Sequence, residues 1–429
     1  MKMQSVAIDG FKNLSDVTIK FDKITALVAL NNFGKSNVLK GIDYALNFIK
    51  ASGIDKLRMM SNRRCLPVNK KMFAKNFKYE MQLSTTINEQ IYLVKYGFEF
   101  AWQTTEEKKG KIIHEYLQIK PSGKNRRFVY MINRDENSAF YRSAETGRCD
   151  NIVHVNGTEL VVNRLLMLDK FYLIDIIEKI NSMKIYMEDN YDVKSFYKPL
   201  PFRHKGHYDE FKDDNLPRII YSLQEKSPDK FELLQYVFKQ LFPNIDDIRV
   251  RKIMVQGEDE KHLPDEFPYV FSDAIYELFV MDVNIGKYMN FNILSDGAKR
   301  VFLILTKMIC AERENVALIA IEEPENSIHP KLFQEYIGII DQLLENCKVI
   351  ITSHSPYIIS CLSPSWIHIG VGLHPGIASF YSLSRNGQRK LLDEACQMGE
   401  SIGDYLFSLL SDADSGESVV EYLECDMHE

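Results

Sequence analysis

The sequence lacks any uninterrupted apolar run that approaches the roughly 18 residues of a membrane-spanning helix, and it has no apolar h-region near its start. We therefore expect no membrane span, no membrane partner, no signal peptide and a cytoplasmic location. The seven cysteines are scattered, and no pair has the C-x-x-C spacing of many zinc sites. Their odd number and irregular spacing predict reduced thiols and argue against a zinc site.

Tandem repeats, low-complexity tracts and a sustained heptad pattern are absent as well, which argues against a long coiled-coil arm. There is no excess of positive charge. The net charge of −6 does not indicate a protein that coats nucleic acid, although a local basic patch could still bind it. A chain of 429 residues with 45% hydrophobic content can bury a substantial core, divided over two or three structural units.

One short stretch, residues 29–36, is close to a phosphate-binding loop. The pattern is G-x-x-x-x-G-K-[ST], and Gly34, Lys35 and Ser36 fit it, but Ala29 replaces the first glycine. That glycine lets the chain turn out of a strand at little steric cost. Since alanine is the next smallest residue, we expect a strained but workable loop. The alternative is a surface turn rich in Asn and Gly.

The residues around this loop favour the phosphate-binding interpretation. "KITALVAL" before it is apolar and predicts a buried strand, and apolar residues recur at helical spacing from Val38 to Ile49. A helix that begins near Gly34 would direct its free N–H groups and the positive end of its dipole toward a phosphate. Lys35 would then reach the outer phosphates, and the Ser36 hydroxyl a magnesium ion.

Paired carboxylates follow a second apolar strand, in "VALIAIEEPENSIHP". Glu322 and Glu323 would lie at the carboxyl edge of a parallel sheet, where one could hold magnesium and the other polarise an attacking water. A solvated acidic turn is the alternative. A third apolar strand, "KVIITSHSP", ends at His354 after an intervening helix, which predicts parallel neighbours and a histidine beside the acids.

The rest of the chain is read from its periodicity. Residues 5–21 predict two strands around a turn, and β-like runs from 78 to 155 predict an antiparallel sheet layered on the loop unit. Residues 160–241 are mostly helical in pattern, interrupted by a polar, proline-bearing stretch. "NILSDGAKRVFLILTKM" predicts a helix capped by Ser295 or Asp296, although capping alone does not explain the whole L-S-D-G string.

The order of these motifs resembles the ABC-type ATPase heads of the SMC, RecF and OLD group, in particular the bacterial AAA15/AAA21 ATP-binding proteins. The resemblance implies an α/β fold, a P-loop NTPase of ABC-ATPase head type with an antiparallel β layer and an inserted helical region. We divide the chain into an ATPase lobe at 1–160, a helical insertion at 161–284, a second ATPase lobe at 285–390, and a C-terminal helix with an acidic tail at 391–429. Ala29 departs from the group's glycine-rich loop, and Glu322 stands where Asp is usual.

The resemblance also implies an Mg²⁺-dependent ATPase that works as a homodimer or a higher even oligomer. In such heads ATP lies between the P-loop of one protomer and the signature helix of another. The implied ATP-binding residues are Asn31, Asn32, Phe33, Gly34, Lys35, Ser36, Asn37 and Lys12. The implied catalytic residues are Glu323 and His354. The implied signature residues, acting in trans, are Ser295, Asp296, Gly297 and Lys299. The implied metal-side residues are Ser36, Glu322 and Gln82.

Two biological roles stay open. One is an anti-phage defence ATPase, similar to PARIS and Septu ATPases, that controls a separate nuclease or toxin effector after a DNA or phage-protein trigger. The other is a RecF-like DNA-binding ATPase in repair, for which the basic stretch Lys56–Lys78 is the best surface and a solvated loop the alternative. Asp412 and Asp414 resemble a Toprim nuclease strand, but too few residues and carboxylates accompany them, so we expect no nuclease activity in this chain.

Overall fold

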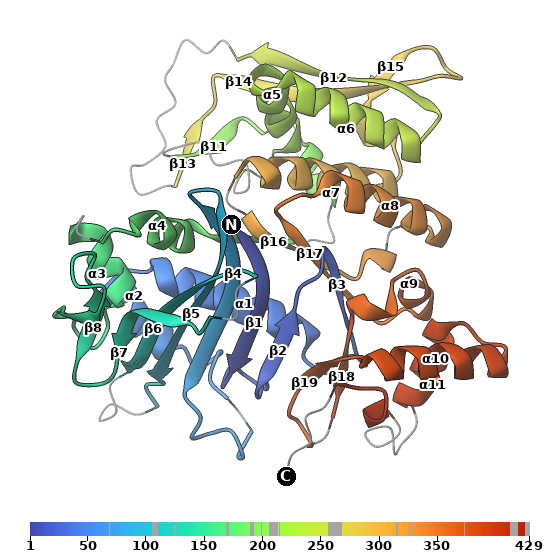
Figure 1. Cartoon of the computed structure of the whole chain (residues 1–429). Helices are drawn as coiled ribbons and strands as arrows, with labels where there is room; N and C mark the ends of the chain where they lie inside the picture. The colour runs from blue at the N-terminus through green and yellow to red at the C-terminus, as the bar shows by residue number, and fades with distance from the viewer. Residues whose placement is uncertain are drawn as a thin grey trace. The chain divides into compact units, whose positions relative to one another are not determined.

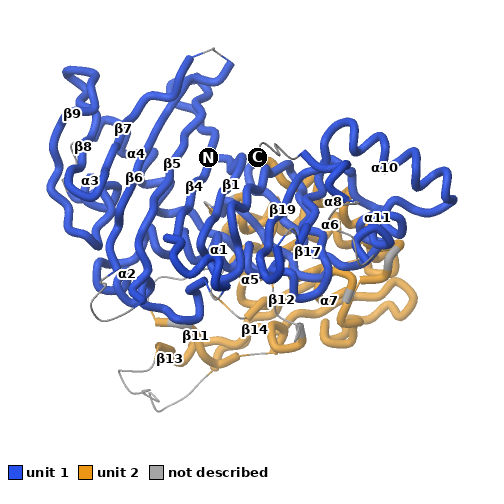
Figure 2. The backbone as a smooth tube through the Cα atoms, turned by 90° about the horizontal axis from the view of Figure 1, so that it is seen from below, with its two compact units in different colours: residues 1–187, 315–323, 346–429 blue, residues 188–314, 324–345 orange. Residues whose placement is uncertain are grey.

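The computed structural model describes the chain except for residues 68, 105–109, 124–125, 169–170, 189–192, 199, 206–212, 214, 256–267, 315, 327, 373, 412–418 and 425–429. Asp412, Asp414 and the acidic tail therefore lie outside the described residues. Two compact units are present, and each combines segments that are distant in sequence (Figure 2). Unit 1 comprises residues 1–187, 315–323 and 346–429, and unit 2 comprises residues 188–314 and 324–345.

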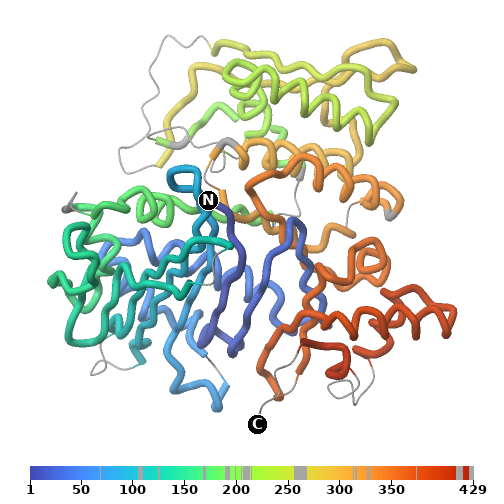
Figure 3. The backbone as a smooth tube through the Cα atoms, in the orientation of Figure 1, coloured from blue at the N-terminus to red at the C-terminus, as the bar shows by residue number. Residues whose placement is uncertain are grey.

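A six-stranded sheet forms the centre of unit 1. Its order is β10-β16-β17-β3-β18-β19, and β3 pairs in parallel with both β17 and β18, which come more than 300 residues later in the chain (Figure 3). All residues of β3 and β18 are buried, as expected for strands covered on both faces. The bounds are β3 Ile24–Val28, β10 Lys184–Glu188, β16 Val316–Glu322, β17 Lys348–Ser353, β18 Ile367–Val371 and β19 Ser379–Ser382.

An eight-stranded antiparallel sheet is the second layer of unit 1, in the order β2-β1-β4-β5-β6-β7-β8-β9 (Figure 1). Burial alternates along β4, so one face of the strand points into the core. The strands are β1 Lys2–Asp9, β2 Val17–Lys20, β4 Phe77–Ile87, β5 Gln90–Ala101, β6 Lys111–Pro121, β7 Val129–Arg134, β8 Ala139–Arg142 and β9 Cys149–Ile152. This sheet is the antiparallel layer that the sequence predicts.

Helix α1 (Lys35–Lys50) packs its apolar face on aromatic side chains of this antiparallel sheet. The Phe48 ring stacks on Phe98 and Phe100, at 5.1 and 4.8 Å between centroids, and the Tyr44 ring meets Phe77 edge-on at 5.4 Å. These contacts fix the helix, and with it the loop that precedes it. The other helices of unit 1 are α2 Gly53–Met60, α3 Val161–Leu168, α4 Ile174–Ser182, α9 Pro356–Ser360, α10 Arg385–Met398 and α11 Ile402–Ser411, with the 3-10 turn η4 Pro364–Trp366.

Unit 2 contains both helices and strands. Its helices pack around aromatic residues, with the Phe302 ring 4.9 Å from Phe238 and 4.8 Å from Phe291 between centroids. The helices are α5 Leu216–Lys226, α6 Pro228–Leu241, α7 Asp296–Arg313 and α8 Pro330–Leu343, and the 3-10 turns are η1 Val193–Tyr197, η2 Phe291–Ile293 and η3 Pro324–Asn326. The strands are β11 Phe202–His204, β12 Ile245–Met254, β13 Tyr269–Phe271, β14 Ala274–Asp282 and β15 Tyr288–Asn290.

The strands of unit 2 add to the helical pattern expected for this region. β12, β14 and β15 form a three-stranded antiparallel sheet, and β11 pairs with β13. None of the helices in the described part of the chain is long and apolar enough to cross a membrane. The six cysteines within the described ranges are free thiols.

Candidate functional site

The loop between β3 and α1 has the backbone shape of a phosphate cradle. Two of its residues have left-handed backbone angles, Asn32 with φ 60° and Gly34 with φ 129°. A Cβ atom on Gly34 would lie 2.9 Å from the Cβ of Ala378, so both the angle and the space require glycine there. α1 then begins at Lys35 with no acidic residue in its first turn, which keeps the positive end of its dipole available to an anion.

Ala29 is accommodated by a glycine on the neighbouring strand. A Cβ atom on Gly370 of β18 would lie 2.7 Å from the Cβ of Ala29 and 2.6 Å from the ring of Phe33. Ala29 is fully buried and is not among the residues with a positive φ. The strain expected at Ala29 is therefore absent, because the room for its methyl group is left by Gly370.

The side chain of Lys35 lies across the loop. Its ammonium donates hydrogen bonds to the carbonyl oxygens of Ala29, at 2.7 Å, and Leu30, at 3.2 Å, and only 7% of the residue is exposed. The positive charge of Lys35 therefore lies against the loop between β3 and α1. The N–H groups at the start of α1 are at the other end of the same loop. This arrangement suits the binding of a polyphosphate.

The turn between β1 and β2 holds the loop from the other side. Asn13 donates to the carbonyl oxygen of Phe33, at 2.9 Å, and its amide oxygen accepts a bond from Asn37, at 2.8 Å. The ammonium of Lys12, a residue with φ 52°, donates to the side-chain oxygen of Asn37 at 3.2 Å. Asn13 was not predicted from the sequence, because a single asparagine in a turn carries no motif.

The predicted acids and histidine converge beside this loop. The hydroxyl of Ser36 donates to Oε2 of Glu322 at 3.2 Å, which joins the start of α1 to the end of β16. Nδ1 of His354 lies 3.4 Å from Oε1 of Glu323, and both side chains are about one-third exposed, at 35% and 28%. Glu323 has φ 46° and its N–H donates to the carbonyl of Thr352 at 2.9 Å. A left-handed glutamate costs conformational energy, and such residues concentrate at functional sites.

The loop, Glu323 and His354 line one cavity of about 530 Å³. Its lining residues are Asn31, Asn32, Phe33, Gly34, Lys35, Ser36, Asn37, Glu323 and His354. Ser36 and Glu322 offer a hydroxyl and a carboxylate oxygen at hydrogen-bond distance from each other, and oxygen donors of this kind are the ligands that Mg²⁺ takes. The residues present therefore fit a magnesium–nucleotide complex.

Gln82 lies elsewhere in unit 1. It is in β4, opposite Ser5 of β1 and Lys95 of β5, and is not one of the residues that line the 530 Å³ cavity.

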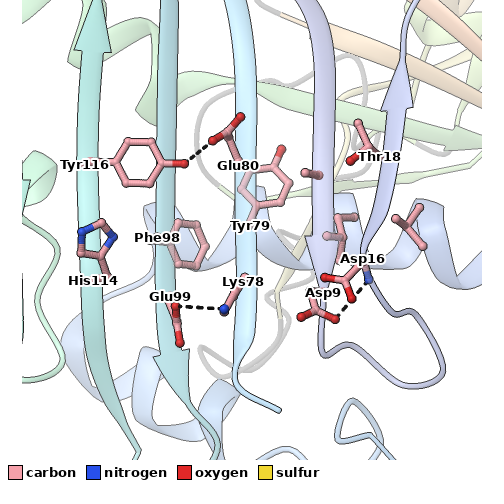
Figure 4. Close-up of a pocket in the computed structure, with 13 residues that line it drawn as sticks. Asp9, Asp16, Thr18, Lys78, Tyr79, Glu80, Phe98, Glu99, His114 and Tyr116 are labelled. Carbon is pink, nitrogen blue, oxygen red and sulfur yellow. Dashed lines mark hydrogen bonds and ion pairs between the residues drawn. The ribbon is translucent and has the colours of Figure 1, made fainter. Parts of the chain in front are cut away.

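A second cavity, of about 310 Å³, is lined by neighbouring strands of the same antiparallel sheet (Figure 4). Its carboxylates have partners: Lys78 lies 3.7 Å from Glu99, the Tyr116 hydroxyl donates to Glu80, and Asp9 and Asp16 pair with Lys75. It has no glycine-bearing loop, so it does not share the chemistry of the first cavity.

The signature residues lie in unit 2, at the start of α7. Ser295 is the N-cap, and its hydroxyl accepts a hydrogen bond from the N–H of Ala298 at 3.2 Å. The ammonium of Lys299 hydrogen-bonds Asp296 at 2.8 Å and lowers the pKa of that carboxyl, with a further contribution from Lys194. Lys299 itself is 2% exposed, so its charge neutralises Asp296 within its own helix.

Residues 1–359 match the family model described as AAA ATPase domain. A search of the curated proteins found no match. The predicted fold class, an α/β P-loop NTPase of ABC-ATPase head type with an antiparallel β layer, is confirmed.

Three solved structures similar to this chain are SMC head domains. The SMC head bound to the C-winged helix domain of ScpA is 15% identical, with 91% of this chain and 100% of that chain covered and a TM-score of 0.48. The head from Thermotoga maritima is 14% identical, with 90% and 100% covered and a TM-score of 0.43. The head with an extended coiled coil bound to the C-terminal domain of ScpA, from Pyrococcus furiosus, is 15% identical, with 92% and 99% covered and a TM-score of 0.45. Because the family model spans most of the chain, the protein belongs to the AAA ATPase domain family and is an ATP-binding ATPase.

Proposed function

We propose that ATP is hydrolysed in the 530 Å³ cavity, with Glu323 as the general base and His354 as the residue that contacts the γ-phosphate. The observation that carries this proposal is the convergence of two pairs, Ser36 with Glu322 and Glu323 with His354, beside one glycine-bearing loop. A carboxylate held by a histidine beside the phosphate site can orient a water and take its proton.

Each remaining residue has a distinct task in this proposal. Lys35 and the N–H groups at the start of α1 bind the phosphates, while Asn13 and Lys12 hold the loop in shape through Asn37. Ser36 and Glu322 would hold Mg²⁺, and the ion would supply positive charge to offset the negative charge on the phosphates. Gln82 is not among the residues that line the cavity, so its metal-side role has the least support of the predicted assignments.

Replacement of Lys35 tests the phosphate site directly. Lys35→Ala removes the ammonium that lies across the loop, so binding of a fluorescent ATP analogue should fall by about 10²-fold or more, the loss expected for a charge-assisted contact in a buried site. Lys40→Ala is the matched control, because Lys40 is an exposed lysine on the same helix and should bind as wild type does. If Lys35→Ala and Lys40→Ala bind the ATP analogue equally well, Lys35 does not bind the phosphates.

We further propose that the complete site needs two copies of the chain. Ser295 and the backbone of Gly297, at the start of α7, would contact the γ-phosphate bound to a partner copy, where the positive end of the helix dipole favours it. The burial of Lys299 and its bond to Asp296 make it a residue that shapes this helix start rather than a phosphate ligand.

For the biological role, we propose a subunit of an anti-phage defence system that controls a separate nuclease or toxin effector. The resemblance to defence ATPases supports it, together with the absence of a sustained heptad pattern from the sequence. Co-expression with the neighbouring gene should give a stable complex and phage protection, and the protection should disappear in Lys35→Ala. A complex whose protection survives Lys35→Ala would contradict control by ATP.

A DNA-binding role in repair is favoured by one specific observation. Within the described residues of the basic stretch, Arg63, Arg64, Lys70 and Lys71 are exposed and form no ion pair with another described residue. By contrast, Arg58, Lys75 and Lys78 pair with acids, and Lys56 is buried. Tight, ATP-dependent binding of duplex DNA with a steep salt dependence, weakened by charge reversal at the four exposed positions, would favour repair over defence. Reversal of the exposed Arg385 and Arg389 on α10 is the control.

A further inference from the structure

The loop that carries His354 is continuous with a helix too short to hold itself in place. His354 is followed by Ser355 and then by α9, whose first residue is Pro356. α9 has five residues, which is less than an isolated helix needs to persist in water. Since the residue before a proline is restricted to extended angles, as Ser355 is with φ −94° and ψ 120°, a displacement of Pro356 is passed on to His354.

α9 packs against the helix α11 of the same unit (Figure 1). α11 lies beyond residue 359, where the match to the family model ends. Gly403 in the first turn of α11 approaches α9 so closely that a Cβ atom there would lie 1.8 Å from the carbonyl oxygen of Pro356. The N–H of Gly403 donates to the hydroxyl of Ser360 at 3.0 Å, and that hydroxyl lies 2.9 Å from the Pro356 carbonyl oxygen. Glycine therefore permits a direct backbone contact between the two helices.

We propose that Gly403 and Ser360 are positioning residues for the ATPase reaction, and that α11 sets the place of His354 beside Glu323 through them. The inference rests on the role proposed above for His354. Nδ1 of His354 lies 3.4 Å from Oε1 of Glu323, so a small movement of α9 changes the contact between the base and its histidine. Nucleotide binding depends on the loop and on Lys35, neither of which α9 carries. The predicted effect is therefore on turnover and not on affinity.

Gly403→Ala is the direct test. It should lower kcat for ATP about tenfold or more, because misplacement of a catalytic group by about 1 Å can cost up to 10²-fold in rate. The dissociation constant of a non-hydrolysable ATP analogue should change less than about twofold, in line with the unchanged phosphate contacts. The double variant with His354→Ala should be no slower than His354→Ala alone, since residues that act through one group are not additive.

Two glycine variants serve as matched controls. Gly338→Ala on α8 adds a Cβ atom into open space on an exposed helix face, so it should leave kcat unchanged. Gly387→Ala on α10 produces a comparable clash, 2.0 Å from the carbonyl oxygen of Tyr422, and the three atoms nearest to the added Cβ all belong to Tyr422. It should lower the melting temperature with a smaller effect on kcat than Gly403→Ala.

The outcomes separate the two claims. If His354→Ala hydrolyses ATP at the wild-type rate, His354 has no catalytic role, and the positioning inference fails with it. Slow turnover in His354→Ala together with wild-type turnover in Gly403→Ala overturns only the inference. If Gly403→Ala does not fold, Ser360→Ala decides: loss of this exposed hydroxyl should lower kcat several-fold at unchanged analogue binding, and an unchanged kcat would overturn the proposal.

Discussion

Ala29, the first residue after β3, and Gly370 of the adjacent strand β18 form a complementary pair of small residues. The phosphate-binding pattern expects glycine at position 29, and the chain instead has a methyl group there that fits because Gly370 has none. Phe33 uses the same space: its ring lies against Gly370 and meets Phe380 edge-on at 5.5 Å between centroids. The shape of the loop thus depends on a residue more than 300 positions away in sequence.

This pair gives a prediction at the residue scale. Gly370→Ala should destabilise the fold by about 1–3 kcal/mol, the usual cost of an extra methyl group in a tight core, and weaken ATP-analogue binding because Phe33 must move. Ala29→Gly alone should be close to neutral, and adding it to Gly370→Ala should recover part of the loss. Thermal unfolding and analogue titration check both. If Gly370→Ala binds the analogue as wild type does, Phe33 and the loop do not depend on that space.

At the scale of single residues, the sequence predicted some residues of the site and missed others. Lys35, Ser36, Glu322, Glu323 and His354 were found because each lies at the end of an apolar strand or the start of a helix, where short motifs report the position. Asn13 and Gly370 were not found. Their contributions come from packing and hydrogen bonds between elements that are adjacent only in the folded chain, and no local pattern records them.

At the scale of elements, apolar runs with sharp ends were predicted well. The strands β3, β16 and β17, the parallel pairing of β16 with β17, the helix α1 and the antiparallel layer were all predicted from the sequence. β10 was read as the end of a helical stretch, because a short apolar run such as "KIYME" does not by itself separate helix from strand. β12 alternates buried and exposed positions only weakly, and its partner β14 follows a long interval, so its pairing could not be read locally.

The start of α7 gives a prediction at the element scale, because Ser295 serves both as an N-cap and as a proposed signature residue. Ser295→Ala should lower the free energy of unfolding by about 1 kcal/mol, the usual loss for a serine cap, and should also slow ATP hydrolysis. Ser52→Ala is a matched control: Ser52 caps α2 with the same 3.2 Å bond to a backbone N–H, outside the proposed site. Equal ATPase rates in Ser295→Ala and Ser52→Ala would show that Ser295 acts only as a helix N-cap.

At the scale of the whole molecule, the proposed two-copy site predicts complementation. Lys35→Ala removes the phosphate ligand of one protomer, and Ser295→Arg blocks the helix start of the other. A mixed dimer of the two keeps one composite site with both wild-type halves, so mixing should restore part of the ATPase activity that neither variant has alone. Mixing Lys35→Ala with the double variant Lys35→Ala/Ser295→Arg should restore none. Mixed dimers that form without any recovery of activity would count against a shared site.

The most direct test of the central claim is ATP hydrolysis by Glu323→Gln, measured beside ATP binding by the same protein. The amide keeps the shape of the side chain and leaves Lys35, Ser36 and Glu322 in place, but it cannot accept the proton of the attacking water. We predict wild-type ATP binding with hydrolysis slowed by about 10²–10⁴-fold, the usual contribution of a general base. Glu335→Gln, on the exposed face of α8, should hydrolyse ATP normally. Hydrolysis by Glu323→Gln at the wild-type rate would contradict the account, because the base would then be another group.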